Sequence, residues 1–73
     1  DRDYEDKEFK KIIKELEDVQ EELKKLQEKI KRFSSELEEP NELLKEQLKV
    51  NEEQLEVNKK ILKILRDQLK QNE

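Results

Sequence analysis

VNEEQLEVN, residues 50–58, contains two Val-Asn pairs seven residues apart, with Gln54 and Leu55 between them. On an α-helix, a seven-residue repeat returns to nearly the same face. The repeat therefore places Asn51 and Asn58 in the uncharged stripe of a helix, where Leu or Ile is the usual occupant. An amide buried there without a hydrogen-bond partner costs about 1–3 kcal/mol. The rest of the chain is expected to provide these two amides with partners.

The composition favours one small helical domain. The 73 residues are 52% charged and 30% apolar, with a net charge of −4 and no Gly, Cys, His, Met or Trp. Such a charged composition is typical of disorder, but here the apolar residues are periodic from Phe9 to Leu69. No segment approaches the roughly 18 apolar residues of a membrane span, and no targeting signal is visible. We expect a soluble protein without a membrane partner, typical of recombinant cytoplasmic expression, although its compartment is unknown.

Residues 3–38 are predicted to form the first helix, with Asp3 as its N-cap. Its apolar residues alternate spacings of three and four, which defines a heptad seam. An a column and a d column lie beside an uncharged e column. The a column is Phe9, Leu16, Leu23, Ile30 and Leu37, the d column is Ile12, Val19, Leu26 and Phe33, and the e column is Ile13, Gln20, Gln27 and Ser34.

Pro40 is predicted to end the first helix, because its ring clashes with the preceding turn and disfavours helical geometry at the residue before it. We predict a turn at residues 39–41, with Asn41 as the N-cap of a second helix at residues 42–71. Two alternatives remain. Ser35 could begin the second helix through a capping box, which would put the proline in its second turn. The chain could also form one long kinked helix. The change of phase of the apolar columns across the proline argues against this alternative.

Four of the seven columns of the second helix are uncharged. They are Leu43, Val50, Val57 and Ile64; Leu44, Asn51, Asn58 and Leu65; Gln47, Gln54, Ile61 and Gln68; and Leu48, Leu55, Leu62 and Leu69. Together they span about 150°, more than one neighbouring helix can cover. Since disulfides are impossible and His is absent, oligomerisation is the remaining source of extra stability. The predicted fold is all-α, an antiparallel two-helix hairpin that oligomerises into a coiled-coil-like helical bundle.

The polar residues of the two helices are predicted to meet in buried hydrogen-bond networks that set register and partner choice. If the turn pairs Leu37 with Leu44, facing residues have numbers that add up to about 81. Amides donate and accept, so they can close networks without a charge, and unpaired amides penalise wrong partners. One network is expected from Ser34, Gln47 and Asn51, and another from Gln27, Gln54, Asn58 and Gln20. Alternatively, these side chains lie half solvated at the margin of the core.

The partner is expected to be a second copy of the chain in a four-helix homodimer, because both helices keep charged columns. A six-helix homotrimer is the second choice, supported by the wide uncharged face of the second helix. Acidic and basic blocks at residues 52–56 and 59–63 favour an antiparallel match of two second helices, by about 0.2–1 kcal/mol for each exposed pair. The predicted apolar interface is Leu44, Leu48, Leu55, Leu62, Leu65, Leu69, Leu16, Leu23 and Ile30.

The chain resembles computationally designed (de novo) helical-hairpin oligomers with buried hydrogen-bond networks. The resemblance rests on the absence of Ala and Gly, on the turn segment ELEEPNELLKEQL at residues 36–48 and on VNEEQLEVNKKIL at residues 50–62. Members of that group form homodimers, homotrimers or heterodimers. The resemblance therefore implies assembly as the function, with a second copy or a cognate designed hairpin as the partner. A natural coiled-coil interaction segment is the alternative.

Catalytic and ligand-binding sites are not expected. Without His and Cys the chain lacks nucleophilic triads and the Glu-x-x-His motif of di-iron bundles, and without Gly it lacks a phosphate-binding loop. A basic patch from Lys59 to Arg66 lies beside acidic residues and has no aromatic for base stacking, which argues against nucleic acid. We therefore expect no enzyme activity, catalytic residue, metal site, cofactor or small-molecule substrate.

Overall fold

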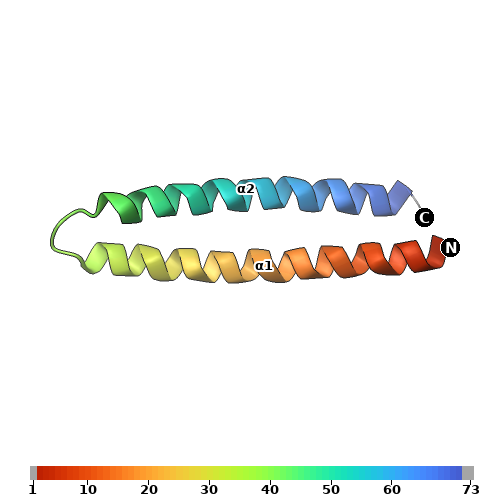
Figure 1. Ribbon diagram of the computed structural model, residues 1–73, viewed down its shortest axis with the longest axis horizontal. Coiled ribbons are helices and arrows are strands. Elements are labelled where there is room, and N and C mark those ends of the chain that lie inside the picture. The colour runs from red at the N-terminus through yellow and green to blue at the C-terminus, as the bar shows by residue number, and fades with distance from the viewer. Residues whose placement is uncertain (1, 72–73) are drawn as a thin grey trace.

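The chain forms two antiparallel α-helices joined by a turn (Figure 1). The computed structural model describes residues 2–71, with side chains described from residue 4 onward. Helix α1 spans Arg2–Glu36 and helix α2 spans Glu42–Gln71. The two helices pack against each other in an elongated hairpin that measures 57 × 15 × 13 Å. The prediction of an all-helical chain with two packed helices is confirmed.

The N-terminal ends of the two helices differ in how well they were predicted. The Oδ1 atom of Asn41 accepts hydrogen bonds from the backbone N–H of Leu43 at 3.0 Å and of Leu44 at 3.2 Å. Asn41 is therefore the N-cap of α2, as predicted, and it satisfies two of the amides left free at the helix start. Helix α1 already includes Arg2, so Asp3 lies inside its first turn and not at the predicted N-cap position.

The turn is longer than the sequence predicts. Helix α1 ends at Glu36, two residues before the predicted end, and residues 37–41 are not helical. The backbone N–H of Leu37 donates a hydrogen bond to the carbonyl of Ser34 at 3.4 Å, a tighter i to i−3 bond that closes the helix end. Pro40 then keeps the chain from resuming a helix. The chain is therefore neither one continuous helix nor a pair in which α2 begins before the proline.

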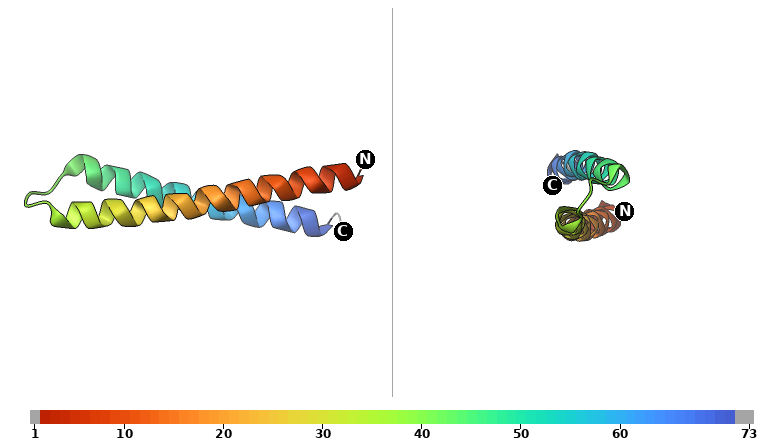
Figure 2. Two further views of the ribbon diagram at one scale, coloured as in Figure 1. Left: turned by 90° about the horizontal axis from the view of Figure 1, so that it is seen from below. Right: turned by 90° about the vertical axis from the view of Figure 1, so that its left-hand side faces the viewer.

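The longer turn leaves Leu37 outside α1, so the predicted pairing of Leu37 with Leu44 does not join two helical residues. Contacts between the helices join residues whose numbers add up to 75 for the side-chain hydrogen bonds and to 83 for the ion pairs, on either side of the predicted 81. Figure 2 shows the helices crossing at a shallow angle along the hairpin, the geometry of heptad-based packing.

Helix α1 meets α2 through its a and e columns. In the e column Ile13, Gln20 and Gln27 are buried, whereas Ile12 and Val19 of the d column are 49% and 55% exposed. The a column is half-buried from Phe9 to Ile30. The e column can enter the contact because it carries no charge that would have to be desolvated. The d column is consequently turned away from α2.

Replacing Asn41 with Ala is expected to lower the free energy of unfolding by about 0.5–2 kcal/mol, because two amides of α2 lose their acceptor. Chemical denaturation followed by circular dichroism measures the change. The matched control is Asn41→Asp, which retains a capping oxygen and is expected to stay within a few tenths of a kcal/mol of the parent. Equal losses in both variants would contradict the capping role.

Candidate functional site

Four amide side chains are among the most buried groups of the hairpin. Gln27 is 3% exposed, Asn58 5%, Asn51 6% and Gln20 8%. All four lie in the seam between α1 and α2, on the columns through which the helices meet. In the part of the chain that the structure describes, the buried apolar side chains are Ile13 and Leu62. The centre of this seam is therefore polar, which is the reverse of an ordinary two-helix contact.

The hydrogen bonds across the seam repeat every seven residues. Nε2 of Gln20 donates to the backbone carbonyl of Leu55 at 2.8 Å, and Nε2 of Gln27 donates to the carbonyl of Leu48 at 3.0 Å. In each case the residue numbers add up to 75. Because both the donors and the acceptors are one heptad apart, the seam consists of two copies of the same polar layer.

Each layer also contains a hydrogen bond within α2. Nε2 of Gln47 donates to Oδ1 of Asn51, and Nε2 of Gln54 donates to Oδ1 of Asn58, both at 2.8 Å. These pairs are four residues apart, the spacing at which helical side chains meet. Gln47 and Gln54 are themselves exposed, so each bond connects the surface of α2 to the buried seam.

The hydrogen bonds agree with the predicted groups only in part. Gln47 bonds to Asn51 and Gln54 bonds to Asn58 within the expected groups, whereas the glutamines of α1 have other partners. Gln27 was expected to lie level with Gln54, but it bonds to the carbonyl of Leu48. Gln20 bonds to the carbonyl of Leu55 and not to the Gln54 and Asn58 group. The glutamines of α1 therefore reach backbone carbonyls of α2 and not its side-chain amides. Ser34, the third expected member of the turn-side network, is half-buried near the end of α1.

Three buried polar atoms of the seam have no hydrogen-bond partner within the described hairpin. They are Oε1 of Gln20, Oε1 of Gln27 and Nδ2 of Asn51. Two of these atoms are acceptors and one is a donor, so the set can pair further with groups of either kind. A buried polar atom without a partner costs about 1–3 kcal/mol, which makes the seam sensitive to any change in its packing.

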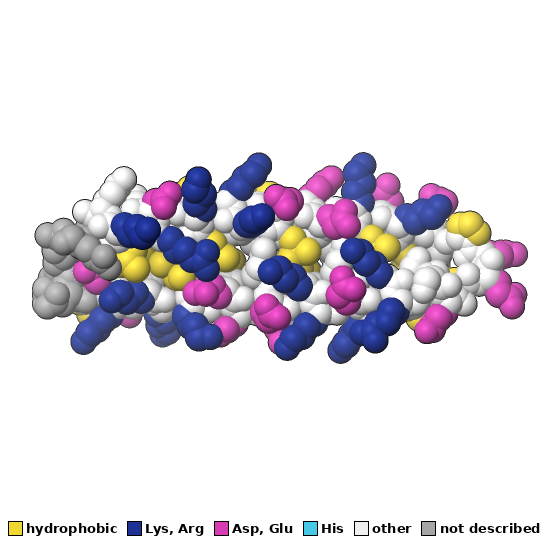
Figure 3. Space-filling model, turned by 180° about the vertical axis from the view of Figure 1, so that it is seen from behind, with side chains coloured by type: hydrophobic (Ala, Val, Ile, Leu, Met, Phe, Trp, Pro, Cys, Tyr) yellow, Lys and Arg dark blue, Asp and Glu magenta, His cyan; other side chains and the backbone are white. Residues whose placement is uncertain are grey.

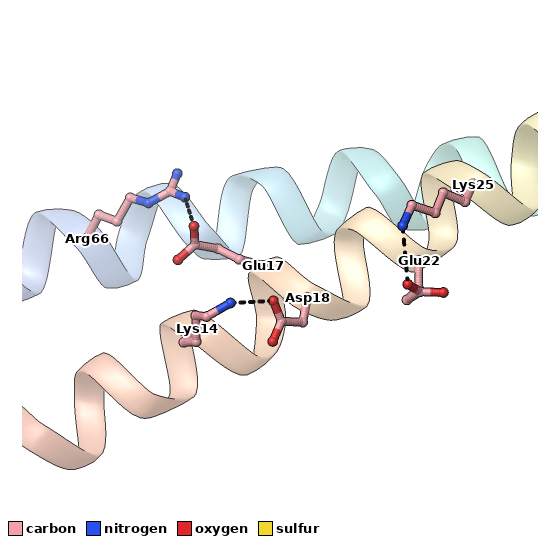
Figure 4. Close-up of polar contacts among 6 residues, drawn as sticks. All are labelled: Lys14, Glu17, Asp18, Glu22, Lys25 and Arg66. Carbon is pink, nitrogen blue, oxygen red and sulfur yellow. Dashed lines mark hydrogen bonds and ion pairs between the residues drawn. The ribbon is translucent and has the colours of Figure 1, made fainter.

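Ion pairs between the helices define one flank of the seam. Nζ of Lys31 lies 3.9 Å from Oε1 of Glu52, and Nη2 of Arg66 lies 3.4 Å from Oε2 of Glu17 (Figure 4). Glu17 and Lys31 belong to the α1 column next to the e column, and Glu52 and Arg66 belong to the α2 column next to that of Leu55 and Leu62. On the face seen in Figure 3, charged side chains of both helices border a narrow apolar strip where the helices meet. We call this side the charged flank.

Charges of opposite sign are mixed along the helices. Lys14 donates a hydrogen bond to Asp18 at 2.7 Å, and Lys25 lies 3.7 Å from Glu22, both within α1 (Figure 4). The hydrogen bond and the charge of Asp18 raise the pKa of the Lys14 ammonium above its usual value of 10.5. A raised pKa favours the charged ammonium further, so the shift does not make Lys14 a nucleophile or a base.

The opposite flank exposes apolar side chains. The d column of α1 lies on the other side of the seam from the charged flank. The α2 column of Leu43, Val50, Val57 and Ile64 and the column of Ile61 lie on the same side, so the exposed apolar residues of both helices share one side of the hairpin. We call this surface the exposed apolar face. Its members are 41% to 82% exposed: Ile12, Val19, Leu26 and Phe33 of α1, and Leu43, Val50, Val57, Ile61 and Ile64 of α2.

The predicted apolar interface residues are buried or half-buried already within the single hairpin. Leu62 is buried, and the others are half-buried along the seam inside one hairpin. These half-buried residues are Leu16, Leu23, Ile30, Leu44, Leu48, Leu55, Leu65 and Leu69. The exposed apolar face was not among the predicted interface residues, although the heptad pattern had already marked its α1 members as the d column.

The basic patch of α2 is partly paired. Arg66 contacts Glu17 across the seam. An open groove on the charged flank is lined by acidic and basic side chains in equal number, together with Gln20 and two leucines. The charged members are Glu17, Glu21, Glu56, Lys24, Lys59 and Arg66. Such a balance selects neither anions nor cations.

No cluster of three or more acidic residues that could hold a metal ion occurs among the described residues. Neither α1 nor α2, as far as the structure describes them, has a stretch long and apolar enough to cross a bilayer. The chain matches no protein-family model, no curated protein and no solved structure.

Replacing both Asn51 and Asn58 with Leu is expected to raise the free energy of unfolding by about 1–3 kcal/mol, because the unpaired donor of Asn51 is removed and apolar burial increases. We also expect additional assembly species, since the polar layers no longer penalise shifted packing. Thermal denaturation at matched protein concentration and light scattering provide the two measurements.

The control for this pair is Gln71→Leu, which makes the same amide-to-leucine change at an exposed position. It is expected to change the free energy of unfolding by less than about 0.5 kcal/mol. A lower melting temperature of the double variant, combined with a single assembly species, would rule out the proposed role of the two asparagines.

Proposed function

We propose that this chain is a structural self-assembly module without biochemical activity, in which two hairpins pack through the exposed apolar face into a four-helix bundle. One observation carries the proposal. In the described hairpin Ile13 and Leu62 are the buried apolar residues, whereas nine large apolar side chains share the exposed apolar face. An extended apolar surface bordered by charges is typical of a protein interaction site.

The accessible surface area supports association with another helical surface. The chain exposes 6267 Å² at a mass of 9.0 kDa. A folded monomer of this mass exposes about 4,900 Å², so the excess is on the order of 1,400 Å². A standard interface removes about 800 Å² from each partner. A second hairpin laid along the exposed apolar face can therefore remove most of the excess.

The shape of α1 is also suited to a helical partner. A shallow groove on this helix is lined by Val19, Leu23 and Leu26, with charged side chains along its outer rim. Grooves between heptad residues receive the side chains of a neighbouring helix in knobs-into-holes packing. The charged rim keeps the outer surface of such a bundle hydrated.

The polar seam gives this assembly its selectivity. Shifting the packing would leave more of its amides without partners, so the seam favours one arrangement over competing ones. The resemblance to designed hairpin oligomers supports both the self-assembly and the designed origin. A homotrimer, or pairing with a separate cognate hairpin, uses the same face, and these are the other outcomes of the test below.

Light scattering on the purified chain is expected to give twice the 9.0 kDa mass of one chain. The melting temperature should rise with protein concentration, because association stabilises the folded form by mass action. A measured mass of three chains would show that the assembly is a homotrimer and not a homodimer. Polydisperse aggregates would indicate a missing partner hairpin, and a stable folded monomer would refute the proposal.

Substituting Glu at Val19 and Val57 is expected to abolish the dimer, because charges placed in an apolar contact are desolvated without a partner. The matched control is Lys24→Gln with Lys59→Gln, which changes the net charge equally but lies on the charged flank. The control should remain dimeric. A Val19→Glu, Val57→Glu variant that still gives the dimer mass would contradict the assignment of the exposed apolar face.

A further inference from the structure

One column of α2 runs along the exposed apolar face and consists of three amides and one apolar residue, Ile61. It contains Gln47, Gln54, Ile61 and Gln68. The column lies between the seam column that holds Asn51 and Asn58 and the outer column of valines. We propose that a second copy docks with its α2 parallel to this α2, so that the column meets itself across a symmetry axis running along the helices. This inference rests on the proposed self-assembly and adds the orientation of the partner.

A parallel match places every residue of the column level with its own counterpart. Gln47 then faces Gln47 of the second copy, Gln54 faces Gln54, and Ile61 faces Ile61. Every amide therefore faces an amide, and the apolar residue faces the same apolar residue of the other copy. Nε2 of Gln54 uses one N–H on Asn58 and keeps a second N–H as well as its Oε1 acceptor. Two such glutamines can each donate to the Oε1 of the other.

An antiparallel match does not achieve this pairing when the helices overlap fully. Ile61 of each copy then faces Gln47 or Gln54 of the other, which leaves two amides of each dimer against an apolar side chain. Each buried amide without a partner costs about 1–3 kcal/mol. In other antiparallel registers the amides do face amides. These registers require one α2 to be shifted along the other by more than a heptad, which leaves either Leu43 or Ile64 uncovered.

The attraction between the charge blocks of α2 is weaker than the cost of leaving these amides unpaired. The acidic block at residues 52–56 and the basic block at residues 59–63 favour an antiparallel match, as the sequence indicates. Exposed ion pairs contribute about 0.2–1 kcal/mol each and are screened by salt. The amide column, which is covered on assembly, therefore decides the orientation.

Near the middle of the helices, the charged residues that flank the contact between the two copies are compatible with the parallel arrangement. An axis along the helices requires α2 to meet the second copy's α1 at the same heights as its own α1. Ion pairs between α1 and α2 of one hairpin join residues whose numbers add up to 83. At about the same spacing, Glu53 of one copy approaches Lys29 of the other, and Lys60 approaches Glu22. Like charges towards the two ends offset part of this attraction, so these pairs support the orientation without determining it.

Nitroxide labels on the outer surface of α2 test the orientation without disturbing the interface. The chain has no cysteine, so Lys49→Cys, Glu56→Cys and Lys70→Cys each give one label on one exposed column. Pulsed electron paramagnetic resonance then measures the distance between the two labels of each dimer. In the parallel arrangement the three distances are equal to within a few Å, because label pairs lie at the same height.

In the antiparallel arrangement the distances differ along the helix. The labels at position 56 lie at nearly the same height, whereas those at position 70 are separated by roughly 40 Å along the axis at a rise of 1.5 Å per residue. A distance that is shortest at position 56 and grows towards both ends would overturn the parallel orientation while leaving self-assembly intact. A monomer mass in light scattering would instead refute the proposed assembly itself.

Discussion

Two helices lying side by side can cover only one strip of each other, and the structure depends on this geometric limit. Helix α1 carries three uncharged columns and α2 carries four. The hairpin uses two columns from each helix and leaves the remainder outside. Burial inside the hairpin and exposure on its apolar face are therefore consequences of the same packing choice. A narrower uncharged stripe would have produced a hairpin without the exposed apolar face.

The packing of the two helices is unusual because the amide side chains occupy the most buried part of the contact between them. Gln27 is more buried than Leu62, the most buried leucine of the described residues. Hydrogen bonds from Gln20 and Gln27 to carbonyls of α2 offset the desolvation of the amides, but unpaired atoms remain in both layers. A seam of this kind contributes less to stability than a leucine seam would, so the hairpin gains from any association that covers its apolar face.

The sequence predicts the two helices, the end of the first near Pro40 and the capping by Asn41 because each follows from a local preference. Periodicity also identifies Asn51, Asn58, Gln20 and Gln27 as residues of the uncharged stripe, and the structure buries all four.

The sequence does not predict which side of the wide stripe faces the other helix. Either the d or the e column of α1 could accompany the a column, and no charge distinguishes them. The partners of the glutamines were missed for a related reason. Proline restricts only its immediate neighbours, so the length of the turn, and with it the register that brings the carbonyls of Leu48 and Leu55 opposite Gln27 and Gln20, depends on the packing of the whole hairpin.

The amides of α2 form two groups with different surroundings, and the bonds between the groups link the two surfaces of the helix. Asn51 and Asn58 belong to the seam, whereas Gln47 and Gln54 are exposed, in the same column as Ile61 of the exposed apolar face. Each glutamine donates to the asparagine four residues later. In the proposed assembly, a second copy that holds Gln54 in one rotamer also holds the Oδ1 atom of Asn58, which accepts the hydrogen bond from Gln54. Recognition of the partner and the internal order of the hairpin are therefore coupled through two short hydrogen bonds.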